Sequence, residues 1–178
     1  FLDDKAVLLT SPQDMEAEDL EFHSGNGTLC IIGNCSREEF ILHREAVQAI
    51  DYGLDFYAPQ TTLTPDGRRV MIAWLQSWDN YLSPEHLAWG GMMTIPRELQ
   101  IKGGRLYQNP IRELEQYRRE KIQYDGVKIR EKQSLEGIRG RQIDLALEIR
   151  GEAYDKFRIY LAMDEKHHTA VIYDRREG

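Results

Sequence analysis

The chain has 178 residues, a formal net charge of −7 at pH 7 and a pI near 5.3. The acidic balance excludes the basic face that non-specific nucleic-acid binding needs, and it disfavours docking on an anionic membrane. The length suits one domain or one and a half, since a chain of this size buries about 70% of the surface that its unfolded form exposes.

The sequence contains no apolar run near the length of a membrane span and no charged-then-apolar leader. We therefore expect no membrane partner and favour a cytoplasmic location. The chain begins F-L-D-D without a Met, so a secreted protein with its signal upstream is the alternative.

Three short strands are predicted in the first fifty residues: Ala6–Thr10, Thr28–Asn34 and Phe40–His43. The acidic segment Asp14–Glu21 separates the first two. We interpret it as a solvated loop, because its carboxylates have no regular metal-ligand spacing. Residues Ala46–Asp51 are expected to be a connector. Short strands without a long helix indicate an antiparallel meander, as in a propeller blade or a sandwich.

Cys30 and Cys35 are the only cysteines. A structural zinc site needs four ligands, and no further Cys or His pair has a suitable spacing, so no metal is expected. We interpret both as small core residues of a strand and the turn after it. A disulfide between them is the alternative.

The rest of the chain can be organised around a hairpin. Phe56–Leu63 is rich in aromatic and β-branched residues, and Val70–Trp78 is a nearly continuous apolar run. Between them lies Thr64–Gly67, in which Pro presets φ for a turn and Asp-Gly tolerates positive φ. The strand ends carry carboxylate, amide and aromatic groups that could face a ligand: Asp55, Tyr57, Gln60, Trp74, Gln76 and Trp78.

A short strand at Met92–Ile95 and a second hairpin, Arg97–Ile101 with Arg105–Gln108, are expected next. Asn109 and Pro110 then form a helix start, with Asn as N-cap and Pro at the first helical position.

From Lys121 onward, apolar and polar residues alternate, as in strands with one solvated face. We expect a second antiparallel domain with an incomplete sheet. Its candidate strands are 122–124, 127–129, 143–149, 157–161 and 171–173.

Three motifs follow one another: D-Y-G-L-D-F-Y-A-P-Q at 51–60, G-R-R-V-M-I-A-W-L-Q-S-W at 67–78 and W-G-G-M-M-T-I-P-R-E-L at 89–99. Together they resemble the invertase and fructosidase family of glycoside hydrolases, family 32, which includes sucrose-6-phosphate hydrolases. Weaker similarity covers Val7–Gln13 and Leu106–Arg118.

The resemblance implies an all-β fold. Residues 1–110 would be the C-terminal part of a five-bladed β-propeller, 111–120 a short helical linker and 121–178 part of a β-sandwich. It also implies hydrolysis of β-fructofuranosyl bonds in sucrose, sucrose 6-phosphate or fructans, with retention through a fructosyl-enzyme. The expected partner is a small carbohydrate substrate, and no cofactor is implied.

A retaining glycosidase needs a nucleophile and an acid/base carboxyl group about 5 Å apart. The resemblance implies three acidic motifs for this chemistry, N-D-P-N, R-D-P and E-C, and none of them occurs in this sequence. In the family all three precede the matched region, so we expect the chain to begin just after them. No catalytic residue is assigned here, and we expect the chain alone to be inactive.

Tyr57 and Trp78 match the sugar-contacting Tyr and Trp of the family. A phenol can hydrogen-bond near a developing charge, and an indole face stacks on the apolar side of a sugar ring. The alternative is that both rings belong to the core. Asp55 is a third candidate, which either accepts hydrogen bonds from sugar hydroxyls or braces Arg68 or Arg69.

Neighbouring residues are expected to have structural roles. Trp74 and Trp89 should pack in the interior, and Arg97 and Glu98 should form an ion pair.

Two other functions remain as alternatives. One is a non-catalytic carbohydrate-binding or structural β module, which the missing acidic motifs favour for this chain alone. The other is a related five-bladed family that acts on pentose or other furanose polymers. The combination of D-F-Y-A with W-L-Q-S-W favours fructosides over that second alternative.

Overall fold

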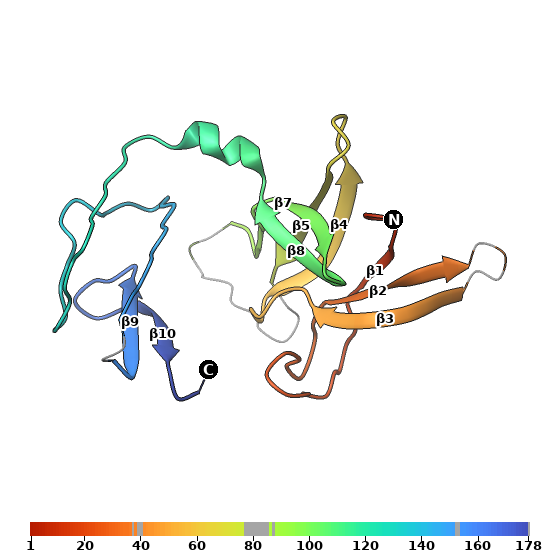
Figure 1. Ribbon diagram of the computed structural model, residues 1–178, viewed down its shortest axis with the longest axis horizontal. Helices are drawn as coiled ribbons and strands as arrows, with labels where there is room; N and C mark the ends of the chain where they lie inside the picture. The colour runs from red at the N-terminus through yellow and green to blue at the C-terminus, as the bar shows by residue number, and fades with distance from the viewer. Residues whose placement is uncertain (37, 39–40, 77–85, 87, 152–153, 178) are drawn as a thin grey trace. The chain divides into compact units, whose positions relative to one another are not determined.

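The computed structural model describes residues 1–36, 38, 41–76, 86, 88–151 and 154–177 (Figure 1). The chain forms two compact units, Phe1–Gln116 and Tyr117–Gly178. Both are built from antiparallel strands. No helix among the described residues has the length and apolar character needed to cross a bilayer.

The first sheet has the strand order β1-β2-β3: β1 (Ala6–Thr10), β2 (Leu29–Ser36) and β3 (Ile41–Ala49). β3 is longer than expected, because residues predicted to be a connector continue it and Val47 pairs with Ile31. The register shifts beside Gly33, where the two backbones approach closely. A Cβ at this position would lie 2.1 Å from the carbonyl oxygen of His43, so only glycine fits.

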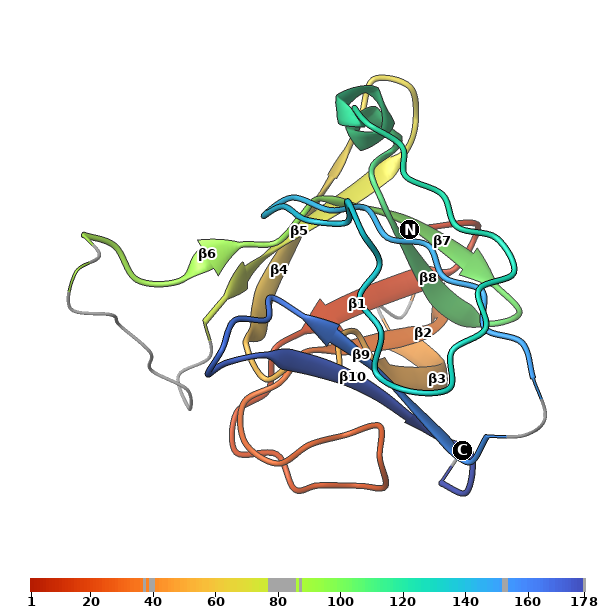
Figure 2. The same cartoon turned by 90° about the vertical axis from the view of Figure 1, so that its left-hand side faces the viewer.

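The second sheet contains β4 (Phe56–Leu63), β5 (Arg69–Leu75), β6 (Met92–Met93), β7 (Arg97–Lys102) and β8 (Arg105–Pro110). Four of these strands have the order β4-β5-β7-β8, and β6 pairs with one end of β5 (Figure 2).

The predicted β4–β5 hairpin is confirmed. The Thr64 N–H donates to the Arg68 carbonyl oxygen at 2.8 Å, and the Gly67 N–H donates to the Thr64 carbonyl oxygen at 2.9 Å. Gly67 has a φ of 86°, a left-handed conformation that glycine adopts without steric cost. The local sequence therefore suffices to fix this turn.

One hydrophobic core is shared by the two sheets of the first unit. Along β5 the apolar run alternates between buried and half-buried side chains, as in a strand with one core-facing side. The buried cluster consists of Cys30, Ile32, Ile50, Phe56, Met71, Ala73, Leu99 and Leu106.

Both cysteines lie in β2 and are free. Cys30 is fully buried, and burial raises the pKa of its thiol to about 11. Cys35 is exposed and belongs to the strand rather than to a following turn, which corrects that part of the prediction. Five residues along a strand separate two Cα atoms by roughly 16 Å. This distance is too long for a disulfide.

The predicted helix is a single 3₁₀ helix, η1 (Arg112–Tyr117). It begins later than the sequence predicts, because Asn109 and Pro110 complete β8, where Asn109 pairs with Glu98. The Ile111 N–H, the first after β8, donates to the carbonyl oxygen of Pro96 at 3.0 Å.

Among its described residues, the second unit contains one hairpin, β9 (Lys156–Leu161) with β10 (Thr169–Asp174). The predicted strands in these two places are confirmed. The rings of Phe157 and Tyr173 stack with centroids 5.3 Å apart, which gives the hairpin a small apolar face.

The other strands predicted in this unit do not form. Residues 122–124, 127–129 and 143–149 are described but are not assigned to any strand, and their apolar side chains are exposed, Ile143 by 51%. An alternating segment becomes a strand only when a neighbour accepts its backbone hydrogen bonds and covers its apolar side.

Candidate functional site

The candidate site lies at the end of the β4–β5 hairpin, away from its turn. There Tyr57 of β4 pairs directly with Trp74 of β5. The sequence pattern does not predict this pairing, because a register counted from the turn leaves out the irregularity between Tyr57 and Gln60. Trp78, the other predicted aromatic contact, lies outside the described residues.

A β-bulge explains the irregular register. Ala58 and Pro59 together stand opposite the single residue Ala73, between the pairs formed by Tyr57 and Gln60. Ala73 bonds on its other side: its N–H donates to Thr94 Oγ1 at 3.1 Å, and its carbonyl oxygen accepts from the Thr94 N–H at 2.9 Å. Pro59 has no N–H to leave unpaired, which suits it to this place.

The Tyr57 ring is mostly buried, with 9% of the residue exposed. Its hydroxyl donates to the carbonyl oxygen of Ser11 and accepts from the side-chain amide of Gln13, each at 3.4 Å. Gln13 itself is exposed. Tyr57 thus combines a buried ring with a hydroxyl held beside an exposed polar side chain.

Asp55 is half-buried and immediately precedes β4. Of the two arginines that it was expected to brace, Arg68 forms ion pairs with other carboxylates, those of Asp66, Glu98 and Glu113.

The predicted ion pair between Arg97 and Glu98 is wrong, because consecutive strand residues point to opposite faces of a sheet. Arg97 donates instead to Asp51 Oδ2 at 2.8 Å and to Gln108 Oε1 at 3.0 Å. Its guanidinium also lies 4.8 Å from the centroid of the Phe56 ring. Arg97 therefore supports the start of β4, one residue before Tyr57.

Trp74 is half-buried, and its indole nitrogen lies close to Gly91. A Cβ on Gly91 would lie 2.3 Å from that nitrogen, so a side chain at this position would displace the indole. Trp89 is 64% exposed, which corrects the expectation that it packs in the interior.

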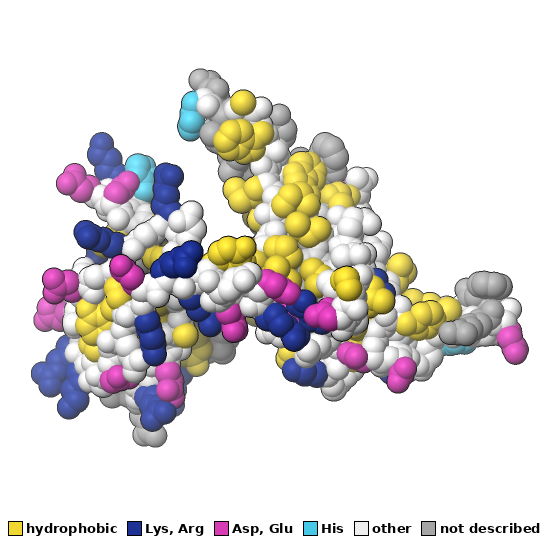
Figure 3. Space-filling view, turned by 90° about the horizontal axis from the view of Figure 1, so that it is seen from above, with side chains coloured by type: hydrophobic (Ala, Val, Ile, Leu, Met, Phe, Trp, Pro, Cys, Tyr) yellow, Lys and Arg dark blue, Asp and Glu magenta, His cyan; other side chains and the backbone are white. Residues whose placement is uncertain are grey.

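The neighbourhood of β6 carries exposed apolar side chains. Figure 3 shows hydrophobic side chains gathered on one face of the first unit. The exposed apolar residues of the segment around β6 are Trp89, Met92, Met93 and Ile95.

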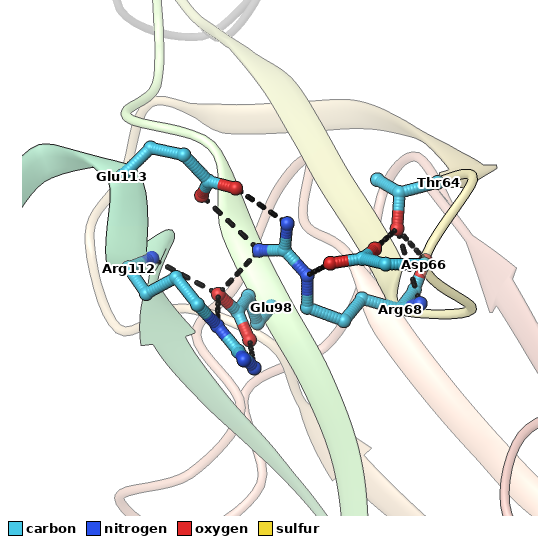
Figure 4. A network of polar contacts seen from close by, with 6 residues as sticks. All are labelled: Thr64, Asp66, Arg68, Glu98, Arg112 and Glu113. Carbon is cyan, nitrogen blue, oxygen red and sulfur yellow. Dashed lines mark hydrogen bonds and ion pairs between the residues drawn. The ribbon is translucent and has the colours of Figure 1, made fainter.

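A separate charged cluster joins the hairpin turn, β7 and η1 (Figure 4). Glu98, whose side chain is 10% exposed, accepts from Arg68 at 2.7 Å and from Arg112 through Nε, Nη2 and the backbone N–H at 2.7 to 3.0 Å. Arg68 also pairs with Glu113 and with Asp66.

This cluster is built to hold charge rather than to transfer protons. Hydrogen bonds from the Arg112 side chain, with help from its backbone N–H and from Arg68, lower the pKa of Glu98 to about 2 against the opposing effect of burial. A carboxyl group with so low a pKa stays ionised at neutral pH, whereas a general acid needs a raised pKa.

Among the described residues no group of three or more His, Cys, Asp or Glu could hold a metal ion.

Residues 2–110, more than half of the chain, match the family described as "Glycosyl hydrolases family 32 N-terminal domain". The chain belongs to glycoside hydrolase family 32. This confirms the resemblance seen in the three sequence motifs.

The family 32 chain is similar to two curated bacterial enzymes. A raffinose invertase from Escherichia coli is 38% identical over 112 residues, which cover 63% of this chain and 24% of the invertase. A sucrose-6-phosphate hydrolase from Staphylococcus xylosus is 29% identical over 171 residues, which cover 96% of this chain and 35% of the hydrolase. The chain thus spans about a quarter to a third of the length of these relatives.

Among solved structures, the GH32 β-fructofuranosidase of Bombyx mori matches with a TM-score of 0.62 and 33% sequence identity. The match covers 69% of this chain and 26% of that enzyme. A variant of the same enzyme has been solved in complex with sucrose, and it matches with a TM-score of 0.61. The family 32 chain is therefore all-β, with antiparallel sheets that match part of a β-fructofuranosidase.

Two residues beside Tyr57 are not predicted by the sequence pattern. Ser11 and Thr28, which are far from Tyr57 in the sequence, contact the backbone on either side of it. Small hydroxyl residues next to turns are too common to indicate such a role. The one available signal was the weak family similarity over Val7–Gln13.

Proposed function

We propose that this family 32 chain is part of a retaining glycoside hydrolase that cleaves β-fructofuranosyl bonds in sucrose, sucrose 6-phosphate or fructans. The observation that carries the proposal is the family match over residues 2–110, together with relatives named as invertase, sucrose-6-phosphate hydrolase and β-fructofuranosidase. The whole protein would be between about two and a half and three times as long as this chain, as its relatives are, since 112 matched residues make up 24% of one relative and 171 make up 35% of the other.

We propose that residues 1–110 are closing blades of a five-bladed propeller and that 121–178 are part of a sandwich domain. The meander β4-β5-β7-β8 supports the first assignment, since a propeller blade is a four-stranded antiparallel sheet. The exposed alternating segments of the second unit support the second, because more strands would be needed to cover their apolar sides.

Within such an enzyme the chain supplies part of the wall of the substrate pocket. Tyr57, Trp78 and Asp55 are the proposed contacts. The Tyr57 hydroxyl, held beside the exposed Gln13, would hydrogen-bond to the sugar, and the indole of Trp78 would stack on the ring. The nucleophile and the acid/base would come from outside this chain, since none of the family's three acidic motifs occurs in it.

The proposal is tested on the full-length protein that includes this chain. We expect fructose release from sucrose or sucrose 6-phosphate, and the first product observed by NMR should be β-fructofuranose, because retention preserves the anomeric configuration. Release of a pentose from a furanose polymer, with no hydrolysis of fructosides, would instead support the related furanosidase.

A non-catalytic role for the chain by itself is the second candidate, and the missing acidic motifs favour it. We expect the pure chain to release no glucose or fructose from sucrose above a blank. Measurable turnover by the pure chain would show that a catalytic pair lies among its own residues.

A further inference from the structure

The hydroxyl side chains of Ser11 and Thr28 form hydrogen bonds with the backbone on both sides of Tyr57. The Ala58 N–H donates to Ser11 Oγ at 3.1 Å, and Thr28 Oγ1 donates to the Phe56 carbonyl oxygen at 3.2 Å. The two hydroxyl oxygens lie 3.1 Å from each other. Ser11 immediately follows β1 and Thr28 immediately precedes β2, so the two residues link the first sheet to the bulge in the second.

Only one arrangement of protons satisfies all three contacts. A carbonyl oxygen only accepts, so the single hydroxyl proton of Thr28 goes to Phe56. The Ser11 hydroxyl must then donate to Thr28 while it accepts from the Ala58 N–H. The result is a chain of hydrogen bonds with one direction, from Ala58 through Ser11 and Thr28 to Phe56. The hydrogen bonds within such a chain polarise one another, which strengthens each of them.

The bulge needs this support. Ala73, which stands opposite it, directs its backbone groups to Thr94, so the Ala58 N–H has no partner there. Ala58 also has a φ of 49°, a left-handed conformation that is unfavourable for a residue with a Cβ. Strain of this kind persists where surrounding contacts fix it, and it concentrates at functional sites.

We propose that Ser11 and Thr28 are positioning residues for Tyr57. They hold the bulge so that the Tyr57 hydroxyl reaches the carbonyl oxygen of Ser11 and the Gln13 amide at the edge of the site. The proposal rests on the function proposed above, in which Tyr57 contacts the sugar.

The kinetic test is a double-mutant cycle in the full-length protein that includes this chain. Ser11→Ala should lower kcat/KM for sucrose by about tenfold, the scale of one lost hydrogen bond. In a Tyr57→Phe background the same substitution should have little further effect, because the hydroxyl that it positions is already absent. Thr28→Val should behave like Ser11→Ala, and Thr28→Ser should restore activity. Additive losses from Ser11→Ala and Tyr57→Phe would overturn the proposal.

Amide hydrogen exchange on the same proteins tests the hydrogen-bond chain without any sugar. Ser11→Ala should raise the exchange rate of the Ala58 amide about tenfold while the buried Leu99 in β7 keeps its rate. Ser24→Ala is the matched control, because Ser24 is exposed and Ala keeps the carbonyl oxygen that contacts His23. An unchanged exchange rate at Ala58, or an equal rise at Leu99, would show that Ser11 and Thr28 do not hold the bulge locally.

The two readouts separate the proposals. If the wild-type protein hydrolyses no fructoside, the proposed function is wrong. The hydrogen-bond chain of Ser11 and Thr28 is then tested by amide hydrogen exchange at Ala58 alone. An active wild type with additive variants defeats only the positioning role.

Discussion

Gln48 of β3 binds the backbone of Leu106 in β8 through both ends of its side-chain amide. Its Nε2 donates to the Leu106 carbonyl oxygen, and its Oε1 accepts from the Leu106 N–H, each at 2.9 Å. Both residues are buried. One side chain thus acts as a strand neighbour for β8 and joins the two sheets of the first unit.

Gln48→Ala should strongly destabilise the first unit. The change leaves a donor and an acceptor of Leu106 unpaired in a buried place, and each unpaired group costs about 1–3 kcal/mol. Urea denaturation should show a loss of about 2–6 kcal/mol in the free energy of unfolding. Gln100→Ala is the control, because Gln100 is exposed on the neighbouring β7. Equal stability of the two variants would show that water replaces the lost amide.

The charged cluster around Glu98 predicts a pH-dependent stability. The pKa of Glu98 in the folded chain is about 2, below its ordinary value of 4.5, chiefly because the Arg112 side chain donates to it. A carboxyl group with a lowered folded-state pKa stabilises the fold above its unfolded pKa. That contribution is lost as the pH falls from about 4.5 towards 2. Since Arg112 is largely exposed, we expect about 1–3 kcal/mol rather than the full effect of the shift.

Comparison of the wild type with Glu98→Gln checks this pH dependence. At pH 7 the variant should be less stable, and the difference in free energy of unfolding should shrink as the pH is lowered from 5 to about 2. Glu16→Gln, at an exposed position in the acidic loop, should show a much smaller difference. A difference between wild type and Glu98→Gln that stays constant with pH would contradict the assignment of the lowered pKa.

Local rules predicted the parts of the fold that local interactions determine. The residues of the T-P-D-G turn are sufficient to predict the β4–β5 hairpin, and the alternating pattern predicts β9 and β10. The pairing of Tyr57 with Trp74 depends on a bulge, which shifts the register without a sequence signature. Glu98 and Glu113 pair with Arg68, and Asp51 pairs with Arg97, from elements distant in sequence, so no spacing rule could assign them.

The candidate site was predicted less completely than the fold. Tyr57 and Asp55 are candidates because of the aromatic and acidic composition at a strand end together with the family resemblance. Ser11 and Thr28 could not be predicted, because they bind backbone groups on either side of Tyr57 that lack a partner in β5 only once the bulge has formed.

Trp78→Ala in the full-length protein should weaken transition-state binding and leave the fold intact. Loss of a sugar contact should lower kcat/KM for sucrose by an amount that corresponds to about 1–3 kcal/mol. Trp89→Ala is a matched control, since Trp89 is already exposed. If Trp78→Ala abolishes the melting transition while the remaining folded enzyme keeps normal kinetics, Trp78 belongs to the core.

Ala58→Gly should stabilise the first unit. Ala58 has a φ of 49°, and a Cβ in this left-handed conformation costs roughly 1–2 kcal/mol, a cost that glycine does not have. Glycine also gives the unfolded chain more freedom, which offsets part of the gain, so we expect a net increase of about 0.5–1 kcal/mol in the free energy of unfolding. Ala46→Gly, in β3, should have the opposite sign, because glycine there loses entropy and a half-buried methyl group that packs against the core, without relief of strain. Urea denaturation of both variants measures the contrast, and two losses of equal size would show that the Ala58 backbone is not strained.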